Sequence, residues 1–326
     1  MTEKEIQEMV ISWGLGLDDG SEFMALQELI RYLDKLLFSE YDVLPKFKQR
    51  LNGWLGNVEK VEEKKSLYQL IPNLFFVGSK EFKSLYKTAF EENYLQWLFK
   101  TSGELKFDST ESFNAIIQEE VNRTAFTKLT DSMNLNDFYH ANGLINKGLS
   151  IDWYADVRAG GEDRVASSIE LLKKRNIERV VILDDHVGSG SQMDYVLNGA
   201  NTLFSEFSVL VIPLLCGKTG YENGMSLARA LHFMFKPVLI MNEHVFISAK
   251  QETQSNDILE KVKQIAEKYE KKYIDENNGE YDTIYGFGES GSLLIMHTNC
   301  PNNTMPLIHS NYDEWTPLFP RQGGHR

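Results

Sequence analysis

The sequence predicts an α/β fold in which a parallel-sheet domain, residues 150–326, follows a mostly helical region, residues 1–149. In the first half, apolar residues recur every three or four positions, the spacing that places them on one face of a helix. In the second half, two continuous apolar runs, residues 177–183 and 208–215, alternate with segments of helical spacing. Continuous apolar strands between helices are typical of a parallel sheet that is covered on both faces.

Three segments of the first half carry such an apolar stripe. The second begins near Ser21, whose side chain is placed to cap the free amides of a first helical turn. The third is rich in aromatic rings, and buried helical packing explains it better than a surface for a base or a partner. The charged run 59–65 mixes both signs, which is typical of a solvated face or loop. The stripes are Ile6, Met9, Val10 and Trp13; Phe23, Leu26, Leu29, Ile30, Leu33, Leu36 and Leu37; and Leu85, Tyr86, Phe90, Tyr94, Leu95, Trp97 and Leu98.

The second half predicts a strand–loop–helix–strand unit and a further set of helices and strands. The loop is rich in glycine and serine and directly follows the first apolar run. The expected elements are a helix at 162–175, a strand at 177–183, a helix at 192–204, a strand at 208–215, a helix at 225–235, strands at 238–241 and 245–248, a helix from 256, and a last strand at 292–297.

The composition of the 326 residues excludes several classes of protein. The 34 Lys and Arg against 47 Asp and Glu give a formal net charge of −13, which does not indicate direct binding to nucleic acid. The two cysteines are too few for a disulfide scaffold. The longest apolar run, 209–216, is far shorter than the ~20 residues of a membrane helix. Since residues 1–14 also lack the pattern of a signal peptide, we expect a cytoplasmic protein with no membrane partner.

Residues 180–192, VVILDDHVGSGSQ, carry the clearest chemical signal in the chain. An apolar strand ends in Asp184 and Asp185, and a Gly/Ser loop then leads into a helix. A helix N-terminus presents free amides that bind a phosphate, and glycines let the backbone approach it closely. The carboxylates repel a phosphate but accept hydrogen bonds from ribose hydroxyls, directly or beside Mg²⁺. We therefore expect a sugar diol on the aspartates and its 5′-phosphate on the loop residues Val187, Gly188, Ser189, Gly190 and Ser191.

This segment resembles the phosphoribosyl-pyrophosphate (PRPP) motif of type I phosphoribosyltransferases (PRTases), a family of parallel-sheet α/β enzymes. The resemblance implies that Asp184 and Asp185 hold the ribose and Mg²⁺, and that residues 187–191 cradle the phosphate. In the chemistry of this family, a nitrogen nucleophile attacks C1 of the ribose while pyrophosphate leaves, so no covalent nucleophile is required. His186 lies inside the motif, where it is either a contact to the ligand or an ordinary loop histidine.

The tail of the chain carries a second resemblance. It contains the stretches PNNTMP, residues 301–306, and WTPLFPR, residues 315–321. These are similar to the PNNT-x-P and W-x-PLFPR stretches that end the PRTase-like domains of bacterial conflict and antiphage systems. The similarity covers roughly residues 150–321 and implies an effector with a protein partner in such a system. The turn residues Asn302, Asn303 and Thr304 either face a ligand or satisfy their own backbone.

Two cations are further candidates for contacts to the ligand. Arg158 lies in YADVRAGG, residues 154–161, which is either a pyrophosphate loop or an interhelical turn. Lys218 follows the strand 208–215 within CGKT, the ending of a Walker A loop. The first glycine of that motif would fall at Ile212, inside the strand, so no P-loop is expected, although Lys218 can still meet a phosphate. The other histidines are dispersed and have no zinc-ligand spacing.

These observations support one leading function and two alternatives. The leading hypothesis is a Mg²⁺-dependent glycosyl-transferring enzyme, a PRTase-like effector of antiphage defence, that binds PRPP or a nucleotide and transfers or cleaves at the ribose C1. The first alternative is a non-catalytic sensor in which the same loop binds a nucleotide and controls a partner protein. The second is an interaction subunit whose first half packs on a partner. Residues 1–149 are expected to form a cap or a partner-binding region.

Overall fold

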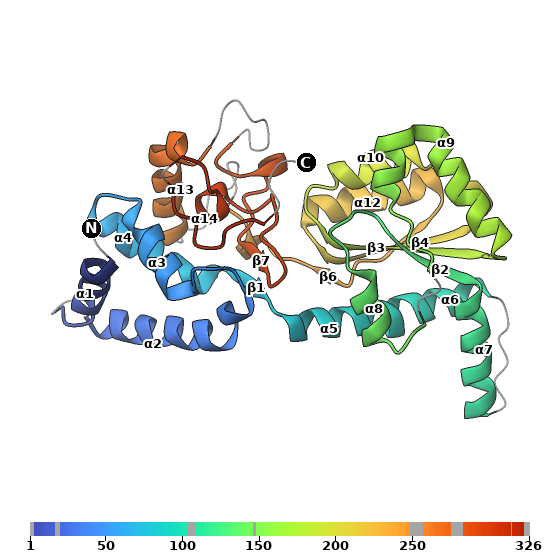
Figure 1. Ribbon diagram of the computed structural model, residues 1–326, viewed down its shortest axis with the longest axis horizontal. Helices are drawn as coiled ribbons and strands as arrows, with labels where there is room; N and C mark the ends of the chain where they lie inside the picture. The colour runs from blue at the N-terminus through green and yellow to red at the C-terminus, as the bar shows by residue number, and fades with distance from the viewer. Residues whose placement is uncertain are drawn as a thin grey trace. The chain divides into compact units, whose positions relative to one another are not determined.

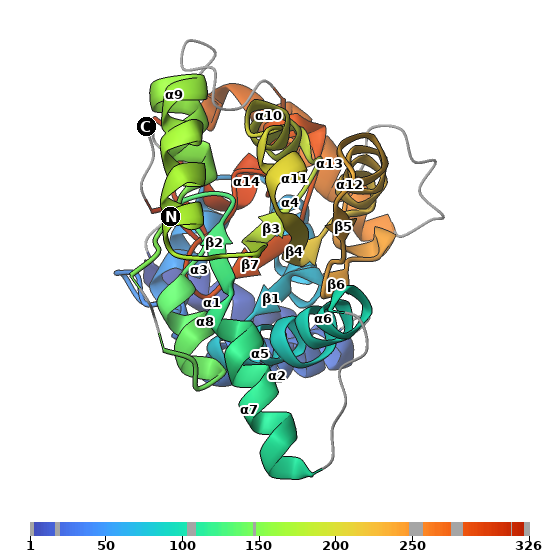
Figure 2. The same cartoon turned by 90° about the vertical axis from the view of Figure 1, so that its right-hand side faces the viewer.

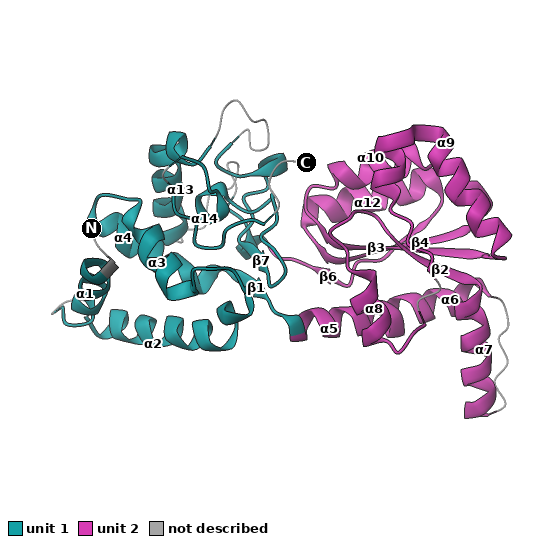
Figure 3. Ribbon diagram, viewed as in Figure 1, with its two compact units in different colours: residues 1–79, 243–326 teal, residues 80–242 magenta. Residues whose placement is uncertain are grey.

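The computed structural model describes residues 3–16, 20–102, 109–145, 148–247, 257–274, 283–313 and 315–322. The chain divides into two compact units (Figure 3). Unit 1 combines residues 1–79 with residues 243–326, and unit 2 contains residues 80–242. The fold is of the α/β class with parallel strands, as the sequence predicts.

Unit 2 is built around a parallel sheet with the strand order β2-β3-β4-β5, in which β6 also pairs with β4. The register places Leu183 of β3 opposite Lys128 of β2 and opposite Ile212 of β4. Since all the pairs are parallel, the carboxyl ends of the strands meet at one edge of the sheet. The strands are β2 (Thr124–Lys128), β3 (Arg179–Val187), β4 (Ser208–Cys216), β5 (Met234–Phe235) and β6 (Leu239–Ile240).

Helices cover both faces of this sheet (Figures 1 and 2). On one face, Val180 and Ile182 of β3 share a buried core with the helices α9, α10 and α12. On the other face, the Phe126 ring lies 5.1 Å from the ring of Tyr94 and 5.2 Å from that of Phe138. The helices of unit 2 are α5 (Ser79–Thr88), the π-helix η3 (Ala89–Tyr94), α6 (Leu95–Thr101), α7 (Thr110–Asn122), α8 (Leu135–Ala141), α9 (Trp153–Lys174), α10 (Ser191–Gly199), α11 (Leu203–Glu206) and α12 (Lys218–Leu231).

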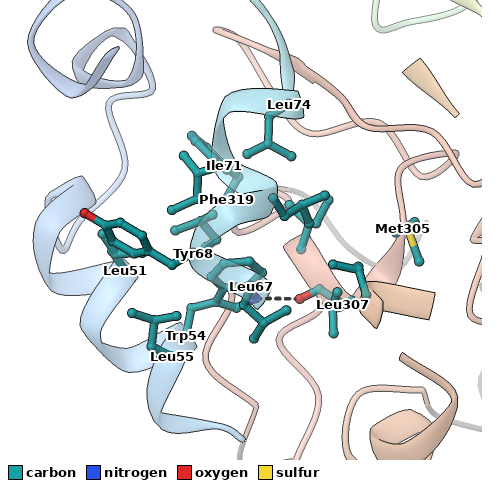
Figure 4. Close-up of a cluster of buried hydrophobic side chains, with 14 of the residues drawn as sticks. Leu51, Trp54, Leu55, Leu67, Tyr68, Ile71, Leu74, Met305, Leu307 and Phe319 are labelled. Atoms are coloured by element: carbon teal, nitrogen blue, oxygen red, sulfur yellow. Dashed lines mark hydrogen bonds between the residues drawn. The ribbon is translucent and has the colours of Figure 1, made fainter. Parts of the chain in front are cut away.

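Unit 1 is mainly helical and contains a small parallel sheet of β1 and β7. Its core joins two segments that are far apart in the sequence. The Trp54 indole donates a 2.9 Å hydrogen bond to the carbonyl of Leu307, and Phe319 packs in the same core (Figure 4). The elements of unit 1 are α1 (Glu3–Trp13), α2 (Gly20–Leu36), η1 (Phe38–Glu40), α3 (Phe47–Gly56), α4 (Val61–Leu70), η2 (Ile71–Asn73), β1 (Phe75–Val77), η4 (Glu243–Val245), α13 (Asp257–Tyr269), η5 (Glu270–Lys272), η6 (Phe287–Glu289), β7 (Leu294–Met296) and α14 (Pro306–His309).

The expected division at residues 149 and 150 does not coincide with the units of the structure. It falls inside unit 2, because β2 from the first half pairs with β3 along its whole length. Residues 1–79 instead pack against residues 243–326. The last expected strand, β7, pairs with β1 of unit 1 and not with the main sheet.

Several smaller expectations are corrected at single residues. Ser21 is the second residue of α2, so it does not occupy the N-cap position of that helix. Lys64, within the run expected to be solvated, is buried, and its ammonium group donates hydrogen bonds to the carbonyls of Leu55 and Val58. Ser248 and Asn256, at which a strand was expected to end and a helix to begin, lie outside the described residues.

The helical character of the first half is confirmed. The aromatic stripe between residues 85 and 98 forms α5, η3 and α6, and Tyr94 and Leu98 within it are fully buried. Across the parts of the chain that the structure describes, none of the helices combines the length and the apolar character that crossing a lipid bilayer requires.

Candidate functional site

The two predicted aspartates lie at the carboxyl end of β3, where the ladder with β4 continues past them to Val187. Both are buried, with 3% of Asp184 and 7% of Asp185 exposed. Each accepts a hydrogen bond from the segment that follows β2. Thr130 donates to Asp184 over 2.7 Å and Ser132 donates to Asp185 over 2.8 Å. The two hydroxyls lie 2.8 Å apart, so this segment fixes the positions of both carboxyl groups.

Burial raises the pKa of both carboxyl groups. The pKa of Asp184 lies well above its ordinary value because the group is desolvated and because the charge of Asp185 is adjacent. The pKa of Asp185 is raised by desolvation as well, although the hydrogen bonds from Ser132 and from the His186 amide oppose the shift. The charged pair is therefore stabilised by any group that brings positive charge or hydroxyl donors to it.

Two adjacent carboxyl groups could hold Mg²⁺ if a ligand completed its coordination. Mg²⁺ is commonly held by one or two carboxylates together with waters and substrate phosphates. The described residues contain no group of three or more His, Cys, Asp or Glu side chains arranged to hold a metal ion. Asp184 and Asp185 could therefore hold such an ion only together with oxygen ligands from water or from a bound phosphate.

The Gly/Ser segment after β3 leads into the N-terminus of α10. Gly190 is the N-cap residue and has φ 85°, a left-handed conformation that glycine adopts without strain. No side chain caps the helix at this residue. The Ser189 hydroxyl lies 3.1 Å from that of Ser191 and accepts a hydrogen bond from the Ser191 amide. Amides of the first turn and the two serine hydroxyls therefore lie together at the start of α10, an arrangement that suits an anion.

The N-terminus of α12 packs directly against this segment. The Gly217 amide donates a 2.8 Å hydrogen bond to the carbonyl of Val187. A Cβ atom at Gly220 would lie 2.5 Å from the Gly188 carbonyl oxygen, so only glycine fits there. The Asn223 amide group donates a 2.7 Å hydrogen bond to the Ser189 carbonyl. Lys218, the first residue of α12, therefore belongs to the same edge of the sheet as the Gly/Ser segment.

His186 lies in β3 and not in a loop. Its amide donates a hydrogen bond to Asp185 over 2.8 Å, and its ring Nε2 is buried with no hydrogen-bond partner among the residues that the structure describes. Burial lowers the pKa of His186 to about 4. The imidazole is therefore neutral at pH 7 and can exchange a hydrogen bond with a ligand, but it does not supply a positive charge.

Arg158 lies in a helical segment that ends at a kink. Residues 154–160 are helical, and the non-helical Gly161, with φ 52°, joins two helices that together make up α9. This geometry favours the interhelical turn over a pyrophosphate loop. The exposed Arg158 guanidinium lies 5.8 Å from the centre of the Tyr154 ring, and that ring lies 6.3 Å from the ring of Tyr195 on α10.

The turn that contains Asn302, Asn303 and Thr304 belongs to unit 1, whereas the aspartates belong to unit 2. Its hydrogen bonds serve the backbone of unit 1. The Asn303 amide group donates to the carbonyl of Phe287, and the buried Thr304 hydroxyl donates to that of Leu294 over 2.6 Å. These contacts favour the alternative in which the turn satisfies its own surroundings.

Sequence reasoning missed Thr130 and Ser132, the residues that hold the aspartates. The signal was the short stretch TAFTKLTDS, residues 124–132, in which β-branched threonines alternate with other residues before Asp131 and Ser132. It lies between long helical patterns, in a half of the chain that the sequence predicts to be mostly helical. Asn223 and Gly220 were missed as well, because their role depends on the packing of α12 against the Gly/Ser segment.

The comparisons with known proteins give one match. The family model described as PRTase-CE matches residues 51–321 of the chain. The match begins at residue 51 and not near residue 150, so it includes parts of both units. Comparisons with curated proteins and with solved structures gave no match.

Proposed function

Because the chain belongs to the PRTase-CE family and so contains a phosphoribosyltransferase-like domain, we propose that it binds PRPP or a nucleotide at the carboxyl edge of the sheet of unit 2. The proposed reaction is transfer or cleavage at C1 of the ribose. The observation that carries the proposal is the buried pair Asp184 and Asp185, held by two hydroxyls directly before a helix N-terminus.

Each part of this edge has a role in the proposal. Asp184 and Asp185 accept hydrogen bonds from the ribose hydroxyls and hold Mg²⁺. Residues 187–191 bind the 5′-phosphate through amides and hydroxyls. Lys218 adds a cation beside them, and the neutral His186 exchanges a hydrogen bond with the ligand. Catalysis by such a site is electrostatic and positional, because the groups present fix the sugar while the bond at C1 breaks.

We further propose that this activity serves a bacterial antiphage defence system, in which the chain is the effector and acts with a protein partner. The stretches 301–306 and 315–321 support this role through their resemblance to the tails of PRTase-like domains in such systems. A test is to express the gene with its genomic neighbours in a phage-sensitive host. Loss of protection in an Asp184→Asn/Asp185→Asn variant is the expected result, and unchanged protection would contradict the effector role.

The test of the biochemical proposal is a calorimetric titration of PRPP with Mg²⁺ into the wild-type chain and into Asp184→Asn/Asp185→Asn. Phosphorus NMR follows the release of pyrophosphate when bases and nucleotides are added. We expect binding that the double substitution weakens at least tenfold, and pyrophosphate release with one class of acceptor. Asp163→Asn, at an exposed aspartate on α9, is the matched control and should bind as the wild type does.

Three other outcomes decide between the alternatives. Binding without turnover for any acceptor would favour the non-catalytic sensor. Equal binding by the wild type and the double variant would remove the aspartates from the site. No binding of PRPP or of any nucleotide by the wild type would reject the sugar-phosphate proposal.

A further inference from the structure

A cluster of two aromatic rings and one cation lies on α9 and on α10, the helix into which the Gly/Ser segment leads. It consists of Tyr154 and Arg158 on α9 and Tyr195 on α10, and half of Tyr195 is exposed. The two rings meet edge to face with their centres 6.3 Å apart, at an angle of 67°. The Arg158 guanidinium lies over the Tyr154 ring and is itself exposed. Tyr154 is half-buried and packs against the core of unit 2, but neither Arg158 nor Tyr195 belongs to that core.

The position of Tyr195 on α10 relates the cluster to the proposed phosphate site. Tyr195 follows Ser191 by four residues, so both lie on the same face of the helix. Side chains on a helix lean towards its N-terminus, and the ring of Tyr195 therefore covers the turn that begins at Ser191. The cluster thus lies next to the start of α10, where residues 188–191 present their amides and hydroxyls.

The position of Tyr154 relates the cluster to the aspartates. The Tyr154 amide donates a 2.9 Å hydrogen bond to the carbonyl of Leu129, and the Leu129 amide donates to Leu183 over 2.8 Å. Leu129 and Leu183 directly precede Thr130 and Asp184, which are hydrogen-bonded to each other. The start of α9 is therefore fixed to the same edge of the sheet, on the side of the aspartate pair.

The helices that carry the cluster are held together by close packing. A Cβ atom at Gly199 of α10 would lie 2.5 Å from the side chain of Val157 on α9. Figures 1 and 2 show α9 and α10 side by side over the same face of the sheet. The relative position of the two tyrosines is thus set by the helices and does not depend on a loop.

We propose that this cluster binds the nucleoside at the far end of a ligand in which two phosphates join that nucleoside to a ribose. The 5′-phosphate of this ribose lies on residues 187–191. The inference rests on the proposed function, which places a ribose phosphate on that segment. A base attached at C1 lies at the opposite end of the ribose from the 5′-phosphate, so it does not reach a platform next to the phosphate. A group joined through the phosphate does reach it. The substrate class is therefore a nucleoside diphosphate-linked ribose, as in NAD⁺ or ADP-ribose.

Each member of the cluster has a part in this arrangement. Tyr195 offers an exposed ring face on which a base stacks. Arg158 lies beside it and pairs with the second phosphate. Tyr154 fixes the position of both by its contacts to the other two side chains.

The test compares two ligands that share the proximal ribose phosphate and differ by an AMP group, ribose 5-phosphate and ADP-ribose. Both are titrated with Mg²⁺ into the wild type and into Tyr195→Ala, Tyr195→Phe and Arg158→Gln. We expect the wild type to bind ADP-ribose at least tenfold more tightly, and Tyr195→Ala to reduce that affinity about tenfold, as the loss of one stacked base does. Tyr195→Phe should retain the preference, because it retains the ring. Arg158→Gln should weaken the binding of ADP-ribose several-fold and that of ribose 5-phosphate less than twofold.

Tyr32→Ala, at an exposed tyrosine of α2 in unit 1, controls for the loss of any surface ring. Equal affinity of the wild type for the two ligands would overturn the inference, and so would a preference for ADP-ribose that survives Tyr195→Ala. In either case, binding of ribose 5-phosphate by the wild type would leave the proposed function standing. Binding of neither ligand by the wild type would reject both. Thermal unfolding of each variant establishes that a lost preference does not come from a lost fold.

Discussion

Asp184 and Asp185 are adjacent carboxyl groups that the fold keeps out of water. Their raised pKa values mean that the folded chain binds protons more tightly than the unfolded chain does. The stability that this tighter binding supplies is present in full below the ordinary aspartate pKa of about 3.9, and it is lost as the pH rises through the folded-state value. Without a ligand, the site is therefore a source of instability at neutral pH.

The free energy of unfolding should depend on pH because the two buried aspartates destabilise the folded chain when they are charged. In the absence of Mg²⁺ and ligand, we expect Asp184→Asn/Asp185→Asn to be more stable than the wild type at pH 8 by roughly 1 kcal/mol or more. The difference should shrink as the pH falls towards about 4. Urea denaturation at several pH values measures it. A difference that stays constant across this range would contradict the prediction.

The neighbouring His186 changes the stability in the opposite direction as the pH is varied. Its pKa of about 4 in the folded chain is below the ordinary histidine value of about 6.5, so its contribution is present above that ordinary value and is lost as the pH falls through the folded-state value. Wild type and double variant both contain this histidine. The comparison between them therefore isolates the aspartates.

The close approach of α12 to the Gly/Ser segment is a feature of whole elements. Gly220 brings the first turn of the helix against the backbone of residues 187 and 188, and Asn223 ties the next turn to Ser189. The shape of the proposed phosphate site thus depends on a helix that lies more than 25 residues further along the chain.

Gly220→Ala tests this dependence. The added methyl group meets the Gly188 carbonyl oxygen at 2.5 Å, so either the segment or the helix must move. We expect a loss of stability of about 1–3 kcal/mol, and a loss of affinity for ribose 5-phosphate of at least tenfold. Gly56→Ala is the matched control, because a Cβ atom there meets only the end of the Ile6 side chain, at 3.4 Å. Unchanged affinity in Gly220→Ala would show that α12 does not shape the site.

The long, strongly patterned elements were predictable from the sequence. The strands β3 and β4 are continuous apolar runs, and α10 and α13 follow clear signals. The strand β2 was not predictable, because five residues between two helical patterns carry too little periodicity to be recognised. The extension of β3 through Asp185 was missed because polar residues normally indicate the end of a strand, whereas here the ladder with β4 continues to Cys216.

Only part of the candidate site was predictable from the sequence, because only part of it is contiguous. The aspartates and the Gly/Ser segment are contiguous in the sequence, so a local pattern identifies them. Thr130 and Ser132 lie more than 50 residues earlier and reach the aspartates only through the pairing of β2 with β3. No spacing rule connects the two stretches.

At the scale of the whole chain, unit 1 is discontinuous, because its two segments precede and follow unit 2 in the sequence. Its core contains residues from both of its segments, and the buried Arg50 connects them. The Arg50 side chain donates hydrogen bonds to the carbonyls of Leu318, Val43 and Pro45, at 2.8, 2.6 and 2.7 Å. The tail stretch 315–321 therefore has a structural role, as its Trp315 and Phe319 also indicate by their burial.

Arg50→Met should destabilise unit 1 strongly. The change leaves three carbonyls without their charged donor, and hydrogen bonds to charged groups contribute about 1.5–3 kcal/mol each. We expect a loss of at least about 3 kcal/mol in urea denaturation followed by tryptophan fluorescence. Arg31→Met, which removes an exposed ion pair with Glu28, should change stability by less than about 1 kcal/mol. Similar losses in the two variants would contradict a connecting role for Arg50.

The division of unit 1 between residues 1–79 and 243–326 also sets an order of events on the ribosome. Residues 80–242 leave the exit tunnel before the end of the second segment has been translated, so the sheet of unit 2 can assemble while the emerged residues 1–79 still lack the part of their core that the second segment supplies. The helices α1–α4 must wait with exposed apolar faces until Leu307 and Phe319 emerge. Exposed apolar surface of this kind attracts chaperones, so we expect them to bind the nascent chain during that interval, and slow translation after residue 242 would prolong its exposure.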